Sequence, residues 1–158
     1  MNGKIVGGFI VGAALVVGAA IYYLQVYAFY SPIAASAEAA EIRLVSVVSG
    51  EPEPVNVTGF EGIDADSSPL RFRACFHIDN SLAMLTETYK LAEDADPLNG
   101  PGWFDCYDAG EIGAALESGE ALAFLSEPEI HPGVERIVAV FSDGRAYAWQ
   151  QLRPDAKD

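Results

Sequence analysis

The residues with the greatest capacity for chemistry are two cysteines and a neighbouring histidine. Cys75 and His77 alternate along an apolar segment with strand periodicity, so both side chains belong to one face of the predicted strand. Cys106 is the other cysteine of the chain. An even cysteine count in an exported domain predicts one structural disulfide, Cys75–Cys106, which would stabilise a small domain by about 3 to 4 kcal/mol.

A metal site formed by the same residues remains an open alternative. Two thiolates and one imidazole form a soft ligand set, and copper is the metal that such a set would favour outside the inner membrane. Cys75, His77 and Cys106 are therefore the candidate ligands. The sequence lacks a Cys-x-x-Cys pair, which argues against a thioredoxin-like redox site. His131 is expected at a turn, because Pro132 and Gly133 follow it.

The sequence contains no motif of a familiar enzyme class. It lacks a Gly-x-Ser-x-Gly elbow, a phosphate-binding loop, a dinucleotide fingerprint and a zinc-protease motif. Residues 64–66 and 94–96 each carry two aspartates but lack the spacing of a calcium loop. No carboxylate stands in an apolar setting that would raise its pKa. We therefore expect a protein that is not an enzyme and has no cofactor.

The charge of the chain excludes nucleic acids as partners. Its 23 acidic and 9 basic residues give a formal net charge of -14. Lys4 alone among the basic residues precedes residue 31, so nearly all of this negative charge belongs to the part after the apolar N-terminus. Such a surface repels DNA, RNA and anionic lipid headgroups. It is typical of a well-solvated domain, and docking to a basic partner is the alternative.

Residues 1–30 are predicted to be a transmembrane anchor. Residues 5–30 contain no Asp, Glu, Lys or Arg, and as a helix they would be about 39 Å long, against about 30 Å for the bilayer core. The run is longer than a typical secretory signal, but Ala35-Ser36-Ala37 fits a cleavage pattern, so a cleaved signal remains an alternative. Aromatic residues gather at the exit and would form an interfacial belt: Tyr22, Tyr23, Tyr27, Phe29 and Tyr30.

The predicted location is the bacterial inner membrane, with a cytoplasmic N-terminus and a periplasmic C-terminal domain. Charge alone hardly decides this orientation, because a single basic residue is nearest to each end of the span, Lys4 before it and Arg43 after it. The cysteine pair favours an exported domain, where a disulfide can persist.

Small residues in the span predict a packing face for another helix. Gly8 and Gly12 form one small-xxx-small pair, and Ala14 and Gly18 form another. Such pairs allow two helix backbones to approach closely in lipid. The partner would be a second copy or a larger membrane complex. The alternative is a simple tether, since Gly and Ala are common in membrane helices.

The rest of the chain is predicted to be a short linker, residues 31–41, and an exported α+β domain, residues 42–158. Strand patterns occur at 41–48, 55–60, 70–78, 103–107 and 121–126, and residues 134–152 indicate a hairpin with Asp143-Gly144 at its turn. Helices are expected at 79–92 and 108–119, the second with a capping box at Asp108 and Glu111. This order predicts a small antiparallel sheet with about two helices.

Three stretches carry a resemblance to a known family: residues 1–30, 103–125 and 130–152. Together they resemble an uncharacterised family of single-span envelope proteins from alphaproteobacteria. The resemblance implies no activity and no catalytic residues. Members sometimes carry a histidine-kinase label, which this sequence does not support, because the chain is too short for a kinase core and lacks nucleotide-binding glycine boxes.

The sequence therefore predicts a non-enzymatic, single-pass membrane protein that is an accessory or assembly subunit of a larger membrane complex, a respiratory complex being one such assembly. Its contacts would be the small-residue helix face and the acidic periplasmic domain. The alternative function is a membrane-anchored periplasmic module that senses a ligand or a metal. The sequence names no partner and no small molecule.

Overall fold

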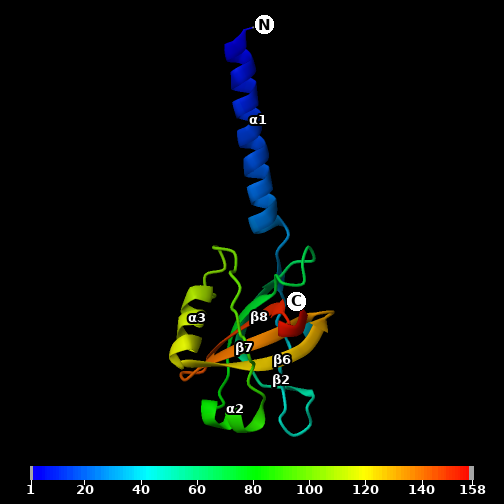
Figure 1. The fold of residues 1–158 in the computed structure, drawn as a ribbon, viewed down its shortest axis with the longest axis vertical. Coiled ribbons are helices and arrows are strands. Elements are labelled where there is room, and N and C mark those ends of the chain that lie inside the picture. The colour runs from blue at the N-terminus through cyan, green and yellow to red at the C-terminus, as the bar shows by residue number, and fades with distance from the viewer. Residues whose placement is uncertain (1, 157–158) are drawn as a thin grey trace. The chain divides into compact units, whose positions relative to one another are not determined.

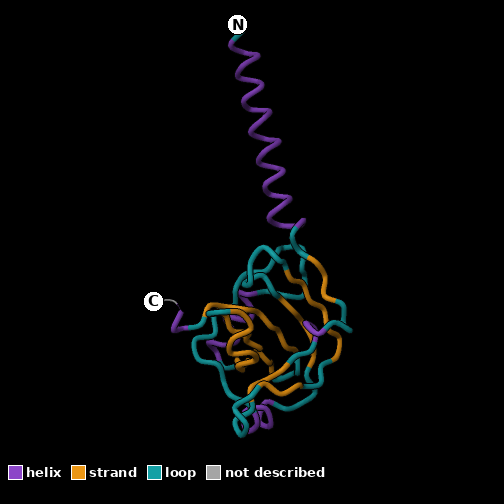
Figure 2. Tube along the Cα trace, turned by 90° about the vertical axis from the view of Figure 1, so that its right-hand side faces the viewer, coloured by secondary structure: helices purple, strands orange, loops and turns teal. Residues whose placement is uncertain are grey.

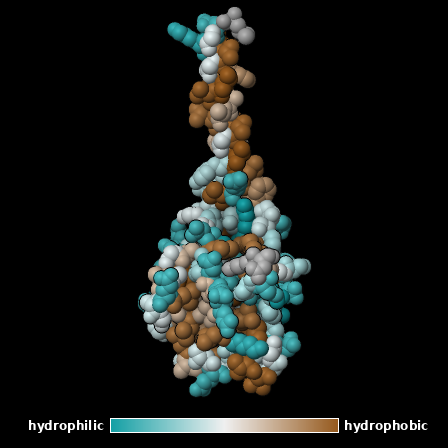
Figure 3. All heavy atoms as spheres, viewed as in Figure 1, coloured by the Kyte–Doolittle hydropathy of each residue, from teal (hydrophilic) through white to brown (hydrophobic). Residues whose placement is uncertain are grey.

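The computed structural model describes residues 2–156 and divides into two compact units, Met1–Tyr30 and Ser31–Asp158. The first unit is the helix α1, Gly3–Tyr23, which continues as a π-helical turn, Leu24–Ala28. The side chain of Asn2 caps α1 by accepting a hydrogen bond from the backbone N–H of Lys4. All residues of α1 are exposed, and apolar residues cover much of its visible length (Figure 3).

The segment Gly3–Ala28 is long and apolar enough to cross a membrane, and it is the single candidate span among residues 2–156. An N-terminal signal sequence would satisfy the same criteria of length and composition. The chain thus has one helix suited to anchoring it in a membrane.

The second unit is an α+β domain, as predicted. Its six-stranded antiparallel sheet has the order β1-β4-β5-β8-β7-β6, and β2 and β3 form a second, two-stranded sheet (Figure 1). The strands are β1 Ser31–Ile33, β2 Arg43–Val45, β3 Pro52–Pro54, β4 Thr58–Asp64, β5 Arg73–His77, β6 Ala121–His131, β7 Val134–Phe141 and β8 Arg145–Leu152. The helices are α2 Leu82–Thr88 and α3 Ala109–Ser118, with 3-10 turns at Glu38–Ala40 and Pro154–Ala156. In Figure 2 the strands lie together and the short helices lie at the periphery of the domain.

The β7–β8 hairpin confirms the strongest local prediction. Gly144 adopts a φ of 90°, a left-handed conformation that glycine adopts without steric cost. The Asp143 side chain accepts a hydrogen bond of 3.0 Å from the Arg145 backbone N–H, which closes the turn. The turn sets the register of the two strands, and β8 then pairs with β5 on its other side.

The helix α3 also agrees with the prediction. The Asp108 side chain accepts hydrogen bonds from the backbone N–H groups of Gly110 and Glu111, at 2.8 and 3.1 Å. At the other end, Gly119 takes a φ of 77°, which is typical of a helix C-terminus. The helix buries Ile112 and Ala115 and packs on β6 and β7.

One face of the large sheet forms the main core, and it follows the alternation predicted for residues 70–78. The inward side chains of the central strands meet β2 and α2. The fully or nearly fully buried members of this core are Ile42, Leu44, Phe72, Ala74, Phe76, Ile78, Leu85, Phe124, Val138, Val140, Ala146 and Ala148.

The opposite face is covered by α3 and by the segment that precedes it. Trp149 is fully buried there, opposite Arg73 and Ile137 in the register of the sheet. The Gln151 side chain holds the covering segment in place. It accepts from the backbone N–H of Asp96 at 2.9 Å and donates to the carbonyl oxygen of Asp94 at 3.0 Å. Both faces of the sheet are therefore buried.

Several predicted boundaries were wrong. The strand predicted at 41–48 is limited to β2, because the Ser46 hydroxyl accepts hydrogen bonds from the backbone N–H groups of Val48 and Ser49 and forms a turn. Pro52–Pro54, for which no strand was predicted, pairs with β2 as β3. The strand predicted at 55–60 is instead β4, Thr58–Asp64, because β4 continues along β5.

The helix predicted at 79–92 ends at Thr88. Lys90 and Ala92 instead run in extended form between the two sheets, where Lys90 N donates to Val45 O and Ala92 N donates to Ala123 O. Residues 103–107 form turns rather than a strand. Of residues 31–41, predicted as a linker, Ser31–Ile33 form β1 and pair with β4. His131 is the last residue of the long strand β6, next to the turn at Pro132-Gly133.

Candidate functional site

The structure brings the two cysteines together. Cys75 on β5 and Cys106, in the turn before α3, are bonded through their sulfur atoms. Their Cα atoms are 6.3 Å apart, and their sequence separation is 31. Cys75 lies on the sheet face that α3 covers and is 8% exposed. The bond joins the central strand β5 to the segment that covers it.

His77 lies two residues further along β5, at the edge of the covered region. Its side chain is 45% exposed, and its Nε2 atom is 3.9 Å from a carboxylate oxygen of Asp79. Within residues 2–156, no group of three or more His, Cys, Asp or Glu side chains is arranged to hold a metal ion. The alternative site of Cys75, His77 and Cys106 would first require reduction of the disulfide, because both sulfur atoms are bonded to each other.

The four small residues predicted for helix packing all lie on α1 and are exposed. A methyl group added at Gly8, Gly12 or Gly18 would meet no atom within 4 Å. An α-helix turns about 100° per residue, so Gly8 and Gly12 define one stripe, and Ala14 and Gly18 define a second stripe about 120° away. The helix thus offers two adjacent small-residue stripes rather than one continuous line.

A cavity lined by charged side chains, here named the Arg136 cavity, was missed by sequence reasoning. It has a volume of about 450 Å³ and lies on the core face of the sheet, between the strand ends and the 3-10 turn Glu38–Ala40. Charged side chains from separate elements line it: Glu38, Glu41, Arg43, Asp64, Glu127, His131 and Arg136. A neighbouring cavity of about 460 Å³ shares Asp64 and His131 with it.

Arg136 is the most buried of these charged residues, with 7% of its surface exposed. Its Nη2 atom donates to the Gln150 side-chain oxygen at 3.1 Å, and its guanidinium carbon lies 3.9 Å from the ring centre of Phe72. Its Nε–H is buried, and no acceptor among residues 2–156 lies within hydrogen-bonding reach. Burial lowers the Arg136 pKa to about 10, although Glu127 and Asp64 oppose this shift, so the side chain remains cationic at neutral pH.

Asp64 occupies the end of β4 in the same cavity. Burial raises the pKa of its carboxyl group, while the hydrogen bond from the Ala65 backbone N–H and the charges of Arg136 and His131 act in the opposite direction. Asp64 is therefore a carboxylate whose pKa is raised by burial, which the sequence did not reveal. One local signal for the cavity existed: Arg136 occupies an inward position in the apolar strand Val134–Phe141.

We expect Asp64→Asn to stabilise the protein at neutral pH. Burial disfavours the ionised carboxyl group in the folded state, so this cost is present above the raised folded pKa and vanishes below the ordinary value of 3.8. Thermal unfolding of the full-length protein in detergent should give a higher Tm for the variant at pH 7 and equal Tm values near pH 3. Asp66→Asn, which changes an exposed carboxyl group two residues away, is the control. A lower Tm for Asp64→Asn at pH 7 would contradict this prediction.

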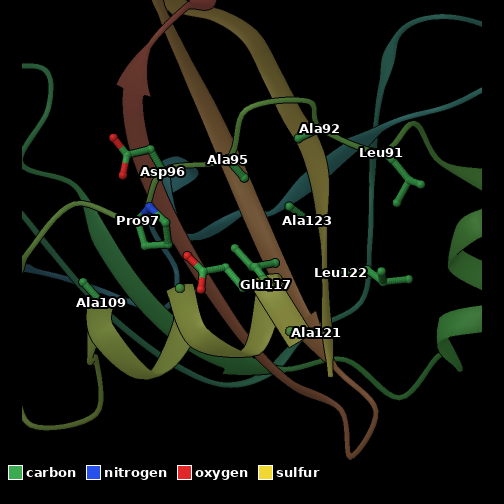
Figure 4. Close-up of a pocket in the computed structure, with 12 residues that line it drawn as sticks. Leu91, Ala92, Ala95, Asp96, Pro97, Ala109, Glu117, Ala121, Leu122 and Ala123 are labelled. Carbon is green, nitrogen blue, oxygen red and sulfur yellow. The ribbon is translucent and has the colours of Figure 1, made fainter. Parts of the chain in front are cut away.

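A third cavity, of about 480 Å³, lies between α3 and residues 91–97. Figure 4 shows Leu91 and Leu122 at one end and Asp96 and Pro97 at the other. Its walls are built largely from alanine and leucine side chains. The charged residues that line this cavity are Asp96 and Glu117, whereas charges of both signs line the cavity that contains Arg136.

Comparison with known proteins yields a family but no activity. A family model described as a family of unknown function, DUF6446, matches residues 42–157. No curated protein and no solved structure matches the chain.

Proposed function

The chain belongs to DUF6446, a family of unknown function, and from this premise we propose that it is a non-enzymatic, membrane-anchored accessory or assembly subunit of a larger membrane complex. The observation that carries this proposal is α1, an apolar helix with all its residues exposed and two stripes of small residues along its surface. A tether needs only hydrophobicity, whereas small residues allow close helix–helix contact in lipid.

In this proposal the span lies in the bacterial inner membrane, with the N-terminus in the cytoplasm and the domain in the periplasm. The Cys75–Cys106 pair supports that orientation, because a disulfide persists in an oxidising compartment. The strongly acidic domain would then face a basic surface of the partner. A respiratory complex is one example of a membrane assembly to which such a subunit would belong.

We expect the double substitution Gly8→Leu and Gly12→Leu to release the protein from its complex. Leucine keeps the segment apolar but prevents the close approach of a second helix at that stripe. The measurement is native sizing of tagged full-length protein after extraction in mild detergent, followed by identification of the proteins that migrate with it. The wild type should migrate with a larger membrane complex, and the variant should migrate alone.

The matched control is Ala13→Leu with Ala20→Leu. These substitutions add similar bulk on the side of α1 away from both stripes, so they should leave the assembly intact. Unchanged association of the Gly8/Gly12 variant would show that the stripe is not a contact. A wild type that migrates alone would overturn the accessory-subunit proposal.

A membrane-anchored ligand-binding module is the second candidate function. The Arg136 cavity favours it, because buried charged groups with shifted pKa values converge there from separate strands. The two functions are compatible, since the helix and the cavity belong to different units of the chain.

A further inference from the structure

We propose that the Arg136 cavity binds a small zwitterion of the α-amino-acid type, whose carboxylate pairs with the Arg136 guanidinium and whose ammonium group pairs with the carboxylates of Asp64 and Glu127. This site rests on the second candidate function and is independent of helix packing by α1.

The buried donor requires an acceptor. Arg136 is 93% buried, because its exposed fraction is 7%, and its Nε–H points to no acceptor among the described residues. Nearly all buried donors in folded proteins are paired, so a buried guanidinium with an unpaired N–H group at the wall of a cavity favours an acceptor from outside the chain. Because Nε itself is closed to solvent, that acceptor would contact the guanidinium at its terminal N–H groups. The Phe72 ring and the Gln150 amide hold the guanidinium in place, which prepares it for a carboxylate or carbonyl oxygen.

The surrounding charges disfavour a simple anion and leave a simple amine incompletely matched. Four carboxylates line the cavity, and they would repel a ligand that carried only negative charge. A ligand that carried only an ammonium group would be attracted by these carboxylates but would offer no acceptor to Arg136. Arg43 is already engaged, because its Nε atom lies 2.9 Å from Glu41 and its Nη1 atom 3.9 Å from Glu127. A ligand with both charges meets an opposite charge at each end, and the cavity volume of about 450 Å³ suits a small molecule.

An arginine at position 136 is less favourable for the stability of the fold than an apolar residue in an apolar surrounding would be. Arg136 lies between the buried residues Val134 and Val138 of β7, where an apolar side chain would fill the same space. Apolar residues of similar volume can often replace a whole buried group of charges without loss of stability, so the fold alone does not require charges at this position. A methionine would retain the contact with the Phe72 ring. We therefore assign Arg136 to ligand binding rather than to support of the core.

The test is isothermal titration calorimetry of the full-length protein in detergent with defined probes. L-Alanine, L-glutamine and L-lysine carry both charges, N-acetyl-L-alanine carries only the carboxylate, and L-alaninamide carries only the ammonium group. At least one of the three amino acids should bind saturably, and removal of either charged group should weaken that binding at least tenfold. Absence of binding by all three amino acids, or equal binding of the single-charge probes, would overturn the proposal.

Variants separate this site from a structural role. Arg136→Met should lose at least tenfold in affinity, and loss of the cation beside Asp64 and Glu127 should also lower its Tm. Asp64→Asn preserves the shape of the cavity and should also weaken binding of the amino acid, so it tests the site even if Arg136→Met fails to fold. Arg153→Gln removes a half-buried arginine that is paired with Asp155 and does not line the cavity, and it should bind like the wild type. Unchanged affinity in a folded Arg136→Met or Asp64→Asn variant would contradict the assignment, whatever the outcome for α1.

Discussion

Replacement of Trp149 by alanine is expected to lower the free energy of unfolding of the domain by about 3 to 5 kcal/mol. Trp149 is fully buried in β8, and its neighbours in the register are Arg73 on β5 and Ile137 on β7. Its truncation would leave a large void beneath the segment that covers this face of the sheet. Since small domains are stable by about 5 to 15 kcal/mol, the loss would be a large fraction of the total.

The indole also has a polar role. Trp149 Nε1 donates to the Gln151 side-chain oxygen at 2.9 Å, and the same oxygen accepts from the Asp96 backbone N–H. The Gln151 amide nitrogen donates to Asp94 and to the Glu135 carboxylate. The tryptophan therefore orients the amide that holds residues 94–96 against the sheet. Its loss should loosen that segment as well as create a void.

Chemical denaturation of the full-length protein in detergent would measure both contributions. Trp149→Phe is the matched variant, because it keeps an aromatic ring but lacks the N–H donor, and it should cost much less than alanine, with about 1 kcal/mol for the hydrogen bond. Equal losses for the two variants would show that the hydrogen bond rather than packing dominates. A decrease of less than 1 kcal/mol in the free energy of unfolding for Trp149→Ala would contradict the core position of Trp149.

Removal of the disulfide by Cys75→Ser with Cys106→Ser is expected to cost about 3 to 4 kcal/mol. The two cysteines are separated by 31 positions, and closing a loop of that length restricts the unfolded chain. The loop contains α2, so loss of the bond would affect the cover of both sheet faces. Dithiothreitol should lower the stability of the wild type by the same amount and leave the double variant unchanged.

Thiol and metal analysis distinguishes the disulfide from the alternative copper site. Protein purified without reductant should contain no reactive thiol after denaturation and no stoichiometric metal. Two free thiols together with one bound metal per chain would instead support ligation by Cys75, His77 and Cys106. The same thiol measurement on cells addresses orientation, because a periplasmic domain should carry an oxidised pair and a cytoplasmic one a reduced pair.

The sequence by itself determined the features that depend on short-range patterns. Asp143-Gly144 specifies a tight turn and therefore the β7–β8 hairpin. Asp108 and Gly119 specify the two ends of α3, and strict alternation specifies the buried face of β5. The run of residues 5–30 specifies a long apolar helix, because it contains no proline and no charged residue. The α+β class follows from the order of these elements.

Only the tertiary structure decided the backbone conformation of segments in which contacts with neighbouring strands override the local sequence preference. The residues after Thr88 have helical spacing, but backbone hydrogen bonds of Lys90 and Ala92 to β2 and β6 hold them extended. Pro52–Pro54 forms a strand because it needs to pair on one side alone, with β2.

The Arg136 cavity is also a product of the tertiary structure. Asp64 is far in the sequence from Glu127 and Arg136, which face each other across the β6–β7 hairpin. The three side chains line one cavity only in the folded domain. A pKa shift by desolvation depends on the surrounding volume rather than on sequence neighbours. Local patterns therefore determined the elements of this protein, whereas its candidate ligand site arose from the packing of strand ends.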